Sequence, residues 1–167
     1  MAKDVYLFPY QKLFFTTMVY GQLYPVFPEA PKMDLFADTL QMGILLVAGI
    51  ASPEYVVQHV KKLSAEVDTA IFPDHHYYTE KDIHLIVRKF YQLQNSKRII
   101  VTTEKDVARL TRLDLFTPEV KSSIYFLPIQ VKFLDREGKL FDKKILNYVG
   151  ENKSNRELHI RKSKPKN

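Results

Sequence analysis

GILLVAGI, at residues 43–50, is a short continuous apolar run. Such a run is typical of a strand that is buried on both faces of a parallel sheet. Ser52 and Pro53 follow it, and these residue types favour the N-cap and the first position of a helix. Apolar residues then recur on one face of that predicted helix: Val56, Val57, Val60 and Leu63. The stretch therefore predicts a strand followed by an amphipathic helix, which is a βα unit.

The same pattern occurs twice more along the chain. Residues 69–72 (TAIF) predict a second strand, and Thr79 begins the helix that follows it. Residues 98–102 (RIIVT) predict a third strand, which leads into a helix over residues 104–112. Alternating strands and helices predict an α/β fold, a three-layer domain with a mostly parallel sheet and right-handed crossovers.

The N-terminal part of the chain predicts a β-hairpin ribbon. A Gly-Gln pair separates two runs that are rich in β-branched and aromatic residues, 12–20 and 23–27. A two-residue loop that begins with glycine is typical of a type II′ turn, and Pro25 would hold the second strand at a sheet edge. We expect the hairpin and a connecting loop, with a short helical turn near Leu35, to make up residues 1–41.

The C-terminal part predicts a strand, a helix and a tail. Residues 124–134 alternate apolar and polar side chains in their second half, so we expect a half-exposed strand that pairs with the hairpin. A helix over residues 138–149 would end the α/β domain, which we place at residues 42–150. Residues 151–167 hold six Lys or Arg and two Asp or Glu, so they carry +4 of the chain's net charge of +6. This composition predicts a basic, flexible tail.

The composition excludes several classes of protein. The chain of 167 residues has no cysteine, which excludes a disulfide framework and a thiolate metal site. It shows neither a signal peptide nor an apolar run near the roughly 18 residues of a membrane span, so we expect a soluble, cytoplasmic protein. None of the five glycines fits the phosphate-binding pattern G-x-x-x-x-G-K or the dinucleotide pattern G-x-G-x-x-G. Any nucleotide would have to be bound by residues elsewhere.

Ligands of open α/β sheets bind at the carboxyl ends of the parallel strands, so the three βα turns are the candidate sites. In the first turn, Gly49 permits close backbone approach, and the helix start near Ser52 presents N–H groups to an anion. In the second, Asp74 and His75 could hold one imidazole tautomer for proton transfer. A tight capped turn explains the first turn equally well. In the second, Asp74 could simply order the turn and His76 could be a surface residue.

The third turn contains charged residues at the start of a helix. Thr103 and Asp106 have the spacing of a capping box, and Glu104 and Asp106 suit the positive end of the helix dipole. These three residues need no function to explain them. Lys105 differs, because a cation in a first helical turn is mildly unfavourable and invites an anionic partner. Adjacent histidines without other spaced ligands make poor chelators, so we expect no metal site.

Three segments together resemble a known family: AGIASP at residues 48–53, FPDHH at 72–76 and TTEKDVARL at 102–110. In this order and at these separations they are similar to the second domain of tetraacyldisaccharide 4'-kinase, from about Tyr10 to Val149. The resemblance implies an enzyme of lipid A biosynthesis. It would transfer the γ-phosphate of MgATP to the 4'-hydroxyl of tetraacyldisaccharide 1-phosphate, forming lipid IVA, at the cytoplasmic face of the inner membrane.

The resemblance also implies a partner domain and a set of site residues. Family members carry an N-terminal P-loop domain that this chain lacks, so ATP and Mg²⁺ would bind the full-length enzyme and the fragment alone would be inactive. His75 would be catalytic, paired with an aspartate of the P-loop domain, and Asp74 would orient its turn. Five more residues would face the substrate cleft: Gly49, Ser52, Glu104, Lys105 and Asp106. The implied partners are the lipid substrate, the P-loop domain and a peripheral membrane contact.

Two other functions remain open from the residues themselves. A solvated terminus explains the basic tail, but the tail also leaves open a non-catalytic binding module that contacts nucleic acid or an anionic surface, although we expect no nucleic-acid partner if the resemblance holds. A free-standing enzyme that uses Asp74 and His75 is the third reading. The absence of an accompanying nucleophile motif weakens it.

Overall fold

The structure is a computed structural model that describes residues 6–32 and 38–162, with side chains described as far as Glu151. It divides into two units. Residues 20–130 form one unit, and the segments up to Val19 and from Val131 onward form the other. The helical turn expected near Leu35 lies outside the described residues.

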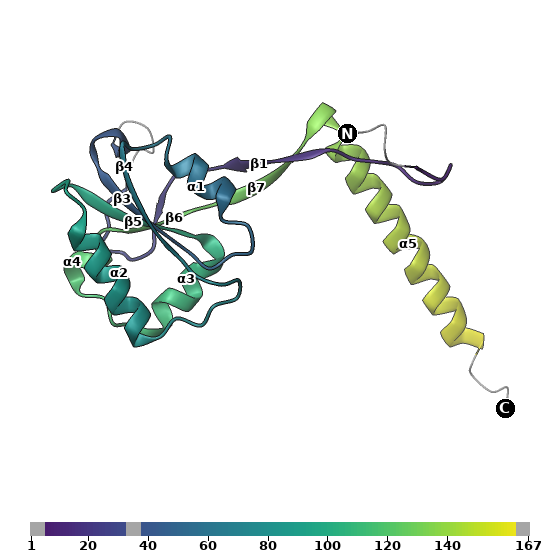
Figure 1. Cartoon of the computed structure of the whole chain (residues 1–167). Helices are drawn as coiled ribbons and strands as arrows, with labels where there is room; N and C mark the ends of the chain where they lie inside the picture. The colour runs from purple at the N-terminus through teal and green to yellow at the C-terminus, as the bar shows by residue number, and fades with distance from the viewer. Residues whose placement is uncertain (1–5, 33–37, 163–167) are drawn as a thin grey trace. The chain divides into compact units, whose positions relative to one another are not determined.

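A five-stranded sheet runs through residues 20–130, in the order β2-β6-β5-β3-β4 (Figure 1). Its strands are β2 (Tyr24–Pro25), β3 (Gly43–Ala48), β4 (Glu66–Ile71), β5 (Arg98–Thr103) and β6 (Ile124–Leu127). β2 is antiparallel to β6, and every other neighbouring pair is parallel. The mostly parallel sheet is therefore confirmed, and so is the edge position of Pro25.

Helices cover both faces of this sheet, which makes three layers. α2 (Glu80–Gln92), α3 (Glu104–Leu110) and α4 (Pro118–Lys121) gather on one side of the strands, and α1 (Glu54–Val60) lies on the other (Figure 1). Along β3, Leu45 and Val47 pack into the core with α2, whereas Ile44 and Leu46 pack into the core with α1. All six residues of β3 are buried. The alternation of β3 side chains between two cores explains why its sequence is apolar throughout.

The N-cap residues of α2 and α3 agree with the prediction from the sequence, and that of α1 does not. Thr79 caps α2 in a complete capping box: its side chain accepts from the backbone N–H of Asp82, and the Asp82 carboxylate accepts from the Thr79 backbone. Thr103 caps α3. The prediction of Ser52 as an N-cap was wrong, because Pro53 takes that position and makes no side-chain hydrogen bond. Short 3-10 turns complete the described elements: η2 (Thr39–Gln41), η3 (Thr111–Leu113) and η4 (Leu134–Arg136).

The predicted N-terminal hairpin was wrong. β1 (Thr16–Tyr20) pairs with β7 (Ile129–Phe133), whereas β2 pairs with β6. No tight turn forms at Gly21, whose N–H instead donates to the carbonyl oxygen of Pro128 at 3.0 Å. The expected pairing of the half-exposed C-terminal strand with an N-terminal strand is nevertheless found in β1 and β7. The break at Pro128 divides the single strand expected there into β6 and β7.

The last helix, α5 (Gly138–Lys162), is longer than expected. Its predicted end at Val149 was wrong, and the backbone of the predicted tail is helical as far as Lys162. That segment has no proline before Pro165 and is rich in Glu, Lys and Arg, which favour helices. Phe141 packs edge-on against Phe14 near the helix start, whereas Tyr148 on the expected apolar face is exposed.

Replacing Thr79 by Ala should lower the free energy of unfolding by about 1 kcal/mol, because the hydroxyl that accepts the Asp82 N–H and donates to the Asp82 carboxylate is lost. Thr79→Ser keeps the hydroxyl and is the matched control. Urea denaturation of both variants at pH 7 measures the difference. Equal stability of the Ala and Ser variants would contradict the role of the box.

Repeating the measurement at low pH tests the charge in the same box. Burial alone would raise the pKa of the Asp82 carboxyl, but hydrogen bonds with Thr79 and His76 outweigh it and lower the pKa below its ordinary value of 3.8. A carboxyl whose pKa is lowered by folding stabilises the fold above its unfolded pKa and loses that effect as the pH falls through the folded pKa. The cost of Thr79→Ala should therefore shrink below about pH 4.

Candidate functional site

The three βα turns meet at the carboxyl ends of neighbouring strands. β3 lies between β4 and β5 in the sheet, so the turns after these strands are adjacent. Lys105 in the third turn donates to the Asp74 carboxylate in the second at 2.8 Å. Asp106 in the third turn accepts from the backbone N–H of Gly49 in the first at 3.0 Å. These two hydrogen bonds alone join four of the seven site residues singled out in the sequence across turns.

Asp106 lies at the centre of this arrangement. It is fully buried, and one oxygen of its carboxylate accepts both the Gly49 N–H and the Thr103 hydroxyl, the latter at 2.6 Å. Its backbone N–H donates to the Thr103 hydroxyl, as the capping spacing predicts. The carboxylate does not return to the Thr103 backbone as it would in a full capping box. It connects the first turn to the third instead.

A side chain at position 49 would be crowded by Asp106 and Tyr78. A Cβ atom at position 49 would lie 3.1 Å from an Asp106 carboxylate oxygen and 3.3 Å from the Tyr78 hydroxyl. The backbone of Gly49 does not have a positive φ, so the requirement is space and not an unusual conformation. The predicted close approach at Gly49 is therefore found, but a carboxylate of the chain makes it.

His75 lies in the second turn with a backbone conformation that is uncommon for residues with a side chain. Its φ is 59°, in the left-handed region, which histidine adopts more readily than most residues. The Asp74 carboxylate accepts the His75 backbone N–H at 2.9 Å and supports this turn. The hydrogen bond from Lys105 lowers the pKa of the Asp74 carboxyl below its usual range. The imidazole ring itself is 70% exposed.

Two cations flank the His75 ring. The guanidinium of Arg109 lies 3.2 Å from Nδ1, and the ammonium of Lys105 lies 3.5 Å from Nε2. Arg109 also contacts the Asp106 carboxylate at 3.4 Å, three residues earlier on α3. Arg109 was not among the site residues predicted from the sequence. The signal that could have found it is its i, i+3 spacing from Asp106, which places both side chains on one helix face.

His76 has a different environment from His75. Its Nε2 lies 3.0 Å from the Asp82 carboxylate, and its ring stacks on Phe72 with a centroid separation of 4.8 Å. His76 therefore connects the second turn to the capping box of α2. These contacts help to hold the second turn in place.

Tyr78 is a second residue that the sequence analysis missed. Its ring packs in the core with α2, and its buried hydroxyl has no hydrogen bond partner among the described residues. Burial and the neighbouring Asp106 carboxylate raise the pKa of this phenol. Nothing in the pattern YY at residues 77–78 separates the buried tyrosine from the exposed one.

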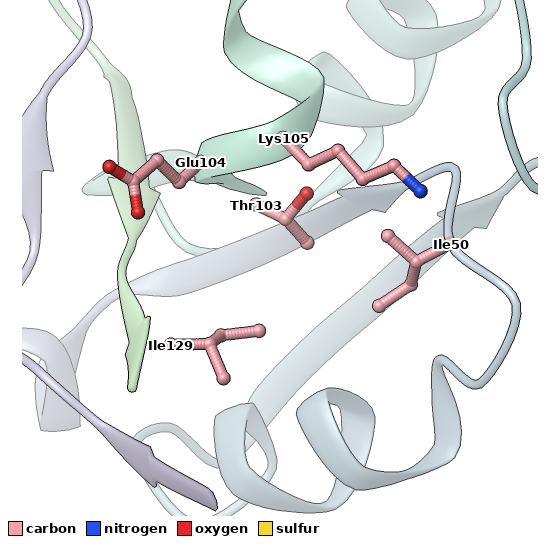
Figure 2. Close-up of a pocket in the computed structure, with 5 residues that line it drawn as sticks. All are labelled: Ile50, Thr103, Glu104, Lys105 and Ile129. Carbon is pink, nitrogen blue, oxygen red and sulfur yellow. The ribbon is translucent and has the colours of Figure 1, made fainter. Parts of the chain in front are cut away.

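A pocket of about 220 Å³ lies beside the third turn. It is lined by Ile50, Thr103, Glu104, Lys105 and Ile129. Figure 2 shows the Lys105 ammonium extending above Ile50, while the Glu104 carboxylate points to the opposite side. Glu104 is thus at this pocket but apart from the group around His75. Ser52 is exposed and makes no hydrogen bond within the described residues.

Two further findings concern the described residues as a whole. Across residues 6–32 and 38–162, no three His, Asp or Glu side chains lie close enough together to hold a metal ion. In the same part of the chain, no helix combines the length and the apolar character that crossing a membrane requires.

Comparison with known proteins gives consistent matches. The family model described as tetraacyldisaccharide-1-P 4'-kinase matches residues 17–149. A tetraacyldisaccharide 4'-kinase of Phocaeicola vulgatus is 40% identical over 155 residues, which cover 93% of this chain and 42% of the relative. One from Bacteroides thetaiotaomicron is 38% identical, with 93% and 43% covered. The chain thus spans about four tenths of the length of these curated relatives. No solved structure matches it significantly.

Replacing Asp106 by Ala should lower the free energy of unfolding by about 3 kcal/mol, because the Gly49 N–H and the Thr103 hydroxyl are left buried without an acceptor. Glu104→Ala, on the exposed side of the same turn, is the control and should change it by less than about 0.5 kcal/mol. Chemical denaturation followed by circular dichroism measures both. A similar small loss in the two variants would show that the buried carboxylate does not hold the turns together.

Proposed function

The chain belongs to the tetraacyldisaccharide-1-phosphate 4'-kinase family, and we propose that it supplies His75 and one wall of the active site to such a kinase. The reaction is the transfer of the γ-phosphate of ATP to the 4'-hydroxyl of tetraacyldisaccharide 1-phosphate, a step of lipid A biosynthesis. The names of the curated relatives support the reaction, and the arrangement of the three turns supports the assignment of the site.

The observation that carries this proposal is the position of His75. Its ring is 70% exposed, yet its backbone is held by Asp74 and its Nδ1 by Arg109. An imidazole that is accessible and fixed in place is suited to hydrogen bonding with a reacting hydroxyl or with a carboxylate that activates the hydroxyl. Asp74 is then a positioning residue, because its carboxylate contacts the His75 backbone and the Lys105 ammonium.

The described residues do not fit the nucleotide or its magnesium ion. The sequence contains no G-x-x-x-x-G-K pattern, and no three His, Asp or Glu side chains of the described residues converge. We propose that ATP and Mg²⁺ are held by a P-loop part of the protein outside this sequence. Phosphoryl transfer depends on positioning and on electrostatic stabilisation of the phosphates, so this chain alone would be inactive.

The pocket beside Lys105 is compatible with an amphipathic substrate. Ile50 and Ile129 give it apolar sides, and Lys105 places an ammonium at its edge. A sugar that carries acyl chains and a phosphate presents both kinds of surface. Because that acceptor is a lipid, we place the complete enzyme at the cytoplasmic face of the inner membrane, in peripheral contact with it.

His75→Ala in the full-length kinase that contains this sequence should lower kcat by about 10²- to 10⁴-fold, the usual contribution of a group that assists proton transfer. His76→Ala is the matched control and should do less, because His76 bonds to Asp82 and stacks on Phe72. Steady-state kinetics with circular dichroism of each variant separates loss of function from loss of folding. Equal and negligible losses of kcat would refute the assignment.

The isolated chain of 167 residues should show no specific binding of ATP with Mg²⁺ by titration calorimetry. The reason is the absence of a phosphate-binding glycine pattern from its sequence. The full-length kinase, titrated under the same conditions, is the positive control. A micromolar affinity of the isolated chain would contradict the proposal.

A further inference from the structure

We propose that Arg109 and Asp106 are positioning residues that hold the His75 ring in one tautomer, with its proton on Nε2. This inference deepens the proposed function and rests on it for its catalytic meaning. The contacts on which it is based join residues of this chain only. The four residues of the network are Gly49, Asp106, Arg109 and His75, and they join all three βα turns.

The first step is the contact between Arg109 and Nδ1 of His75. The two nitrogens are 3.2 Å apart. A guanidinium stays protonated in proteins and has only donors, so it cannot accept a hydrogen bond from an N–H. Nδ1 must therefore present its lone pair to Arg109. A neutral imidazole whose Nδ1 accepts a hydrogen bond carries its single proton on Nε2.

The second step is the environment of the other ring nitrogen. The Asp74 carboxylate lies 3.6 Å from Nε2, which favours an N–H there. The Lys105 ammonium is 3.5 Å from the same nitrogen, but its shorter contact, 2.8 Å, is to Asp74. The ring thus has a donor at Nδ1 and a carboxylate beside Nε2. Both neighbours favour the same tautomer.

The third step is what holds Arg109 in place. Its guanidinium contacts Asp106, which is fully buried and already fixed by the Gly49 N–H and the Thr103 hydroxyl. The Arg109 side chain is itself only 21% exposed. A surface arginine would be free to leave the ring, but this one is held between a buried carboxylate and the imidazole. Arg109 therefore connects the His75 ring to the first and third turns.

The test is the tautomer of His75 in the chain of 167 residues, measured from the two-bond ¹H–¹⁵N correlations of its imidazole ring above the pH of ring protonation. The His75→Ala spectrum assigns the signals. In the unchanged chain the Nε2–H form should exceed the Nδ1–H form by more than about tenfold, since the contact is a hydrogen bond from a charged donor. In Arg109→Met that excess should fall by about tenfold, giving a mixture of tautomers.

Three further variants serve as a control and as additional tests of the tautomer. Arg112→Met removes an arginine that lines the same pocket as Arg109 but forms no hydrogen bond with His75 among the described residues, so it should leave the tautomer unchanged. Arg109→Lys retains a cationic donor and should restore part of the excess. Asp106→Asn removes the charge that anchors Arg109 and should also give a mixture. If Asp106→Asn does not fold, the comparison of Arg109→Met with Arg112→Met still decides.

Kinetics of the full-length kinase link the tautomer to the reaction. Arg109→Met should lower kcat with little change in KM, and Arg109→Lys should recover part of the loss. An unchanged tautomer ratio in Arg109→Met would overturn the inference, whatever the activity. A normal kcat in His75→Ala together with a changed tautomer in Arg109→Met would instead refute the proposed function and leave the positioning network standing.

Discussion

A carboxylate buried without solvent must be surrounded by donors, and the site depends on this requirement at Asp106. Its donors come from the backbone of Gly49, the hydroxyl of Thr103 and the guanidinium of Arg109. These groups lie in the first turn, the third turn and the helix after it. The turns cannot separate without leaving a buried charge unpaired. The need to pair this buried carboxylate therefore keeps Gly49 and Asp106, which are 57 residues apart in the sequence, in contact.

The central part of the fold could be read from the sequence because its signals are local. The continuous apolar run at β3 reports burial on both faces, and Thr79 with Asp82 reports a helix start. The hairpin prediction failed because strand pairing is a tertiary choice. The hydrogen bond of the Gly21 N–H to Pro128 follows from β1 pairing with β7, and no turn pattern within residues 12–27 contains that information.

The sequence predicted that residues of the three βα turns lie together, but it did not predict most of the contacts between them. The rule that ligands bind at the carboxyl ends of parallel strands pointed to Asp74, His75 and Lys105, which the structure brings together. Arg109 was missed because its contact with His75 joins two turns, and Tyr78 was missed because tertiary packing decides which of two adjacent tyrosines is buried. The left-handed backbone of His75 could not be predicted either, since only a few per cent of residues other than glycine have a positive φ, even though histidine is enriched among them.

The engagement of the Gly49 N–H by Asp106 has a consequence for how this fold relates to others of its class. In many α/β proteins the glycine-containing turn after the first buried strand leaves its amides open, and a phosphate of the ligand accepts from them. In this chain the amide of Gly49 is already satisfied by a resident anion, supplied by α3. An internal carboxylate thus satisfies an amide of the kind that a ligand phosphate satisfies in those proteins. The Gly49 amide therefore links the first turn to the third and is not open to a ligand phosphate.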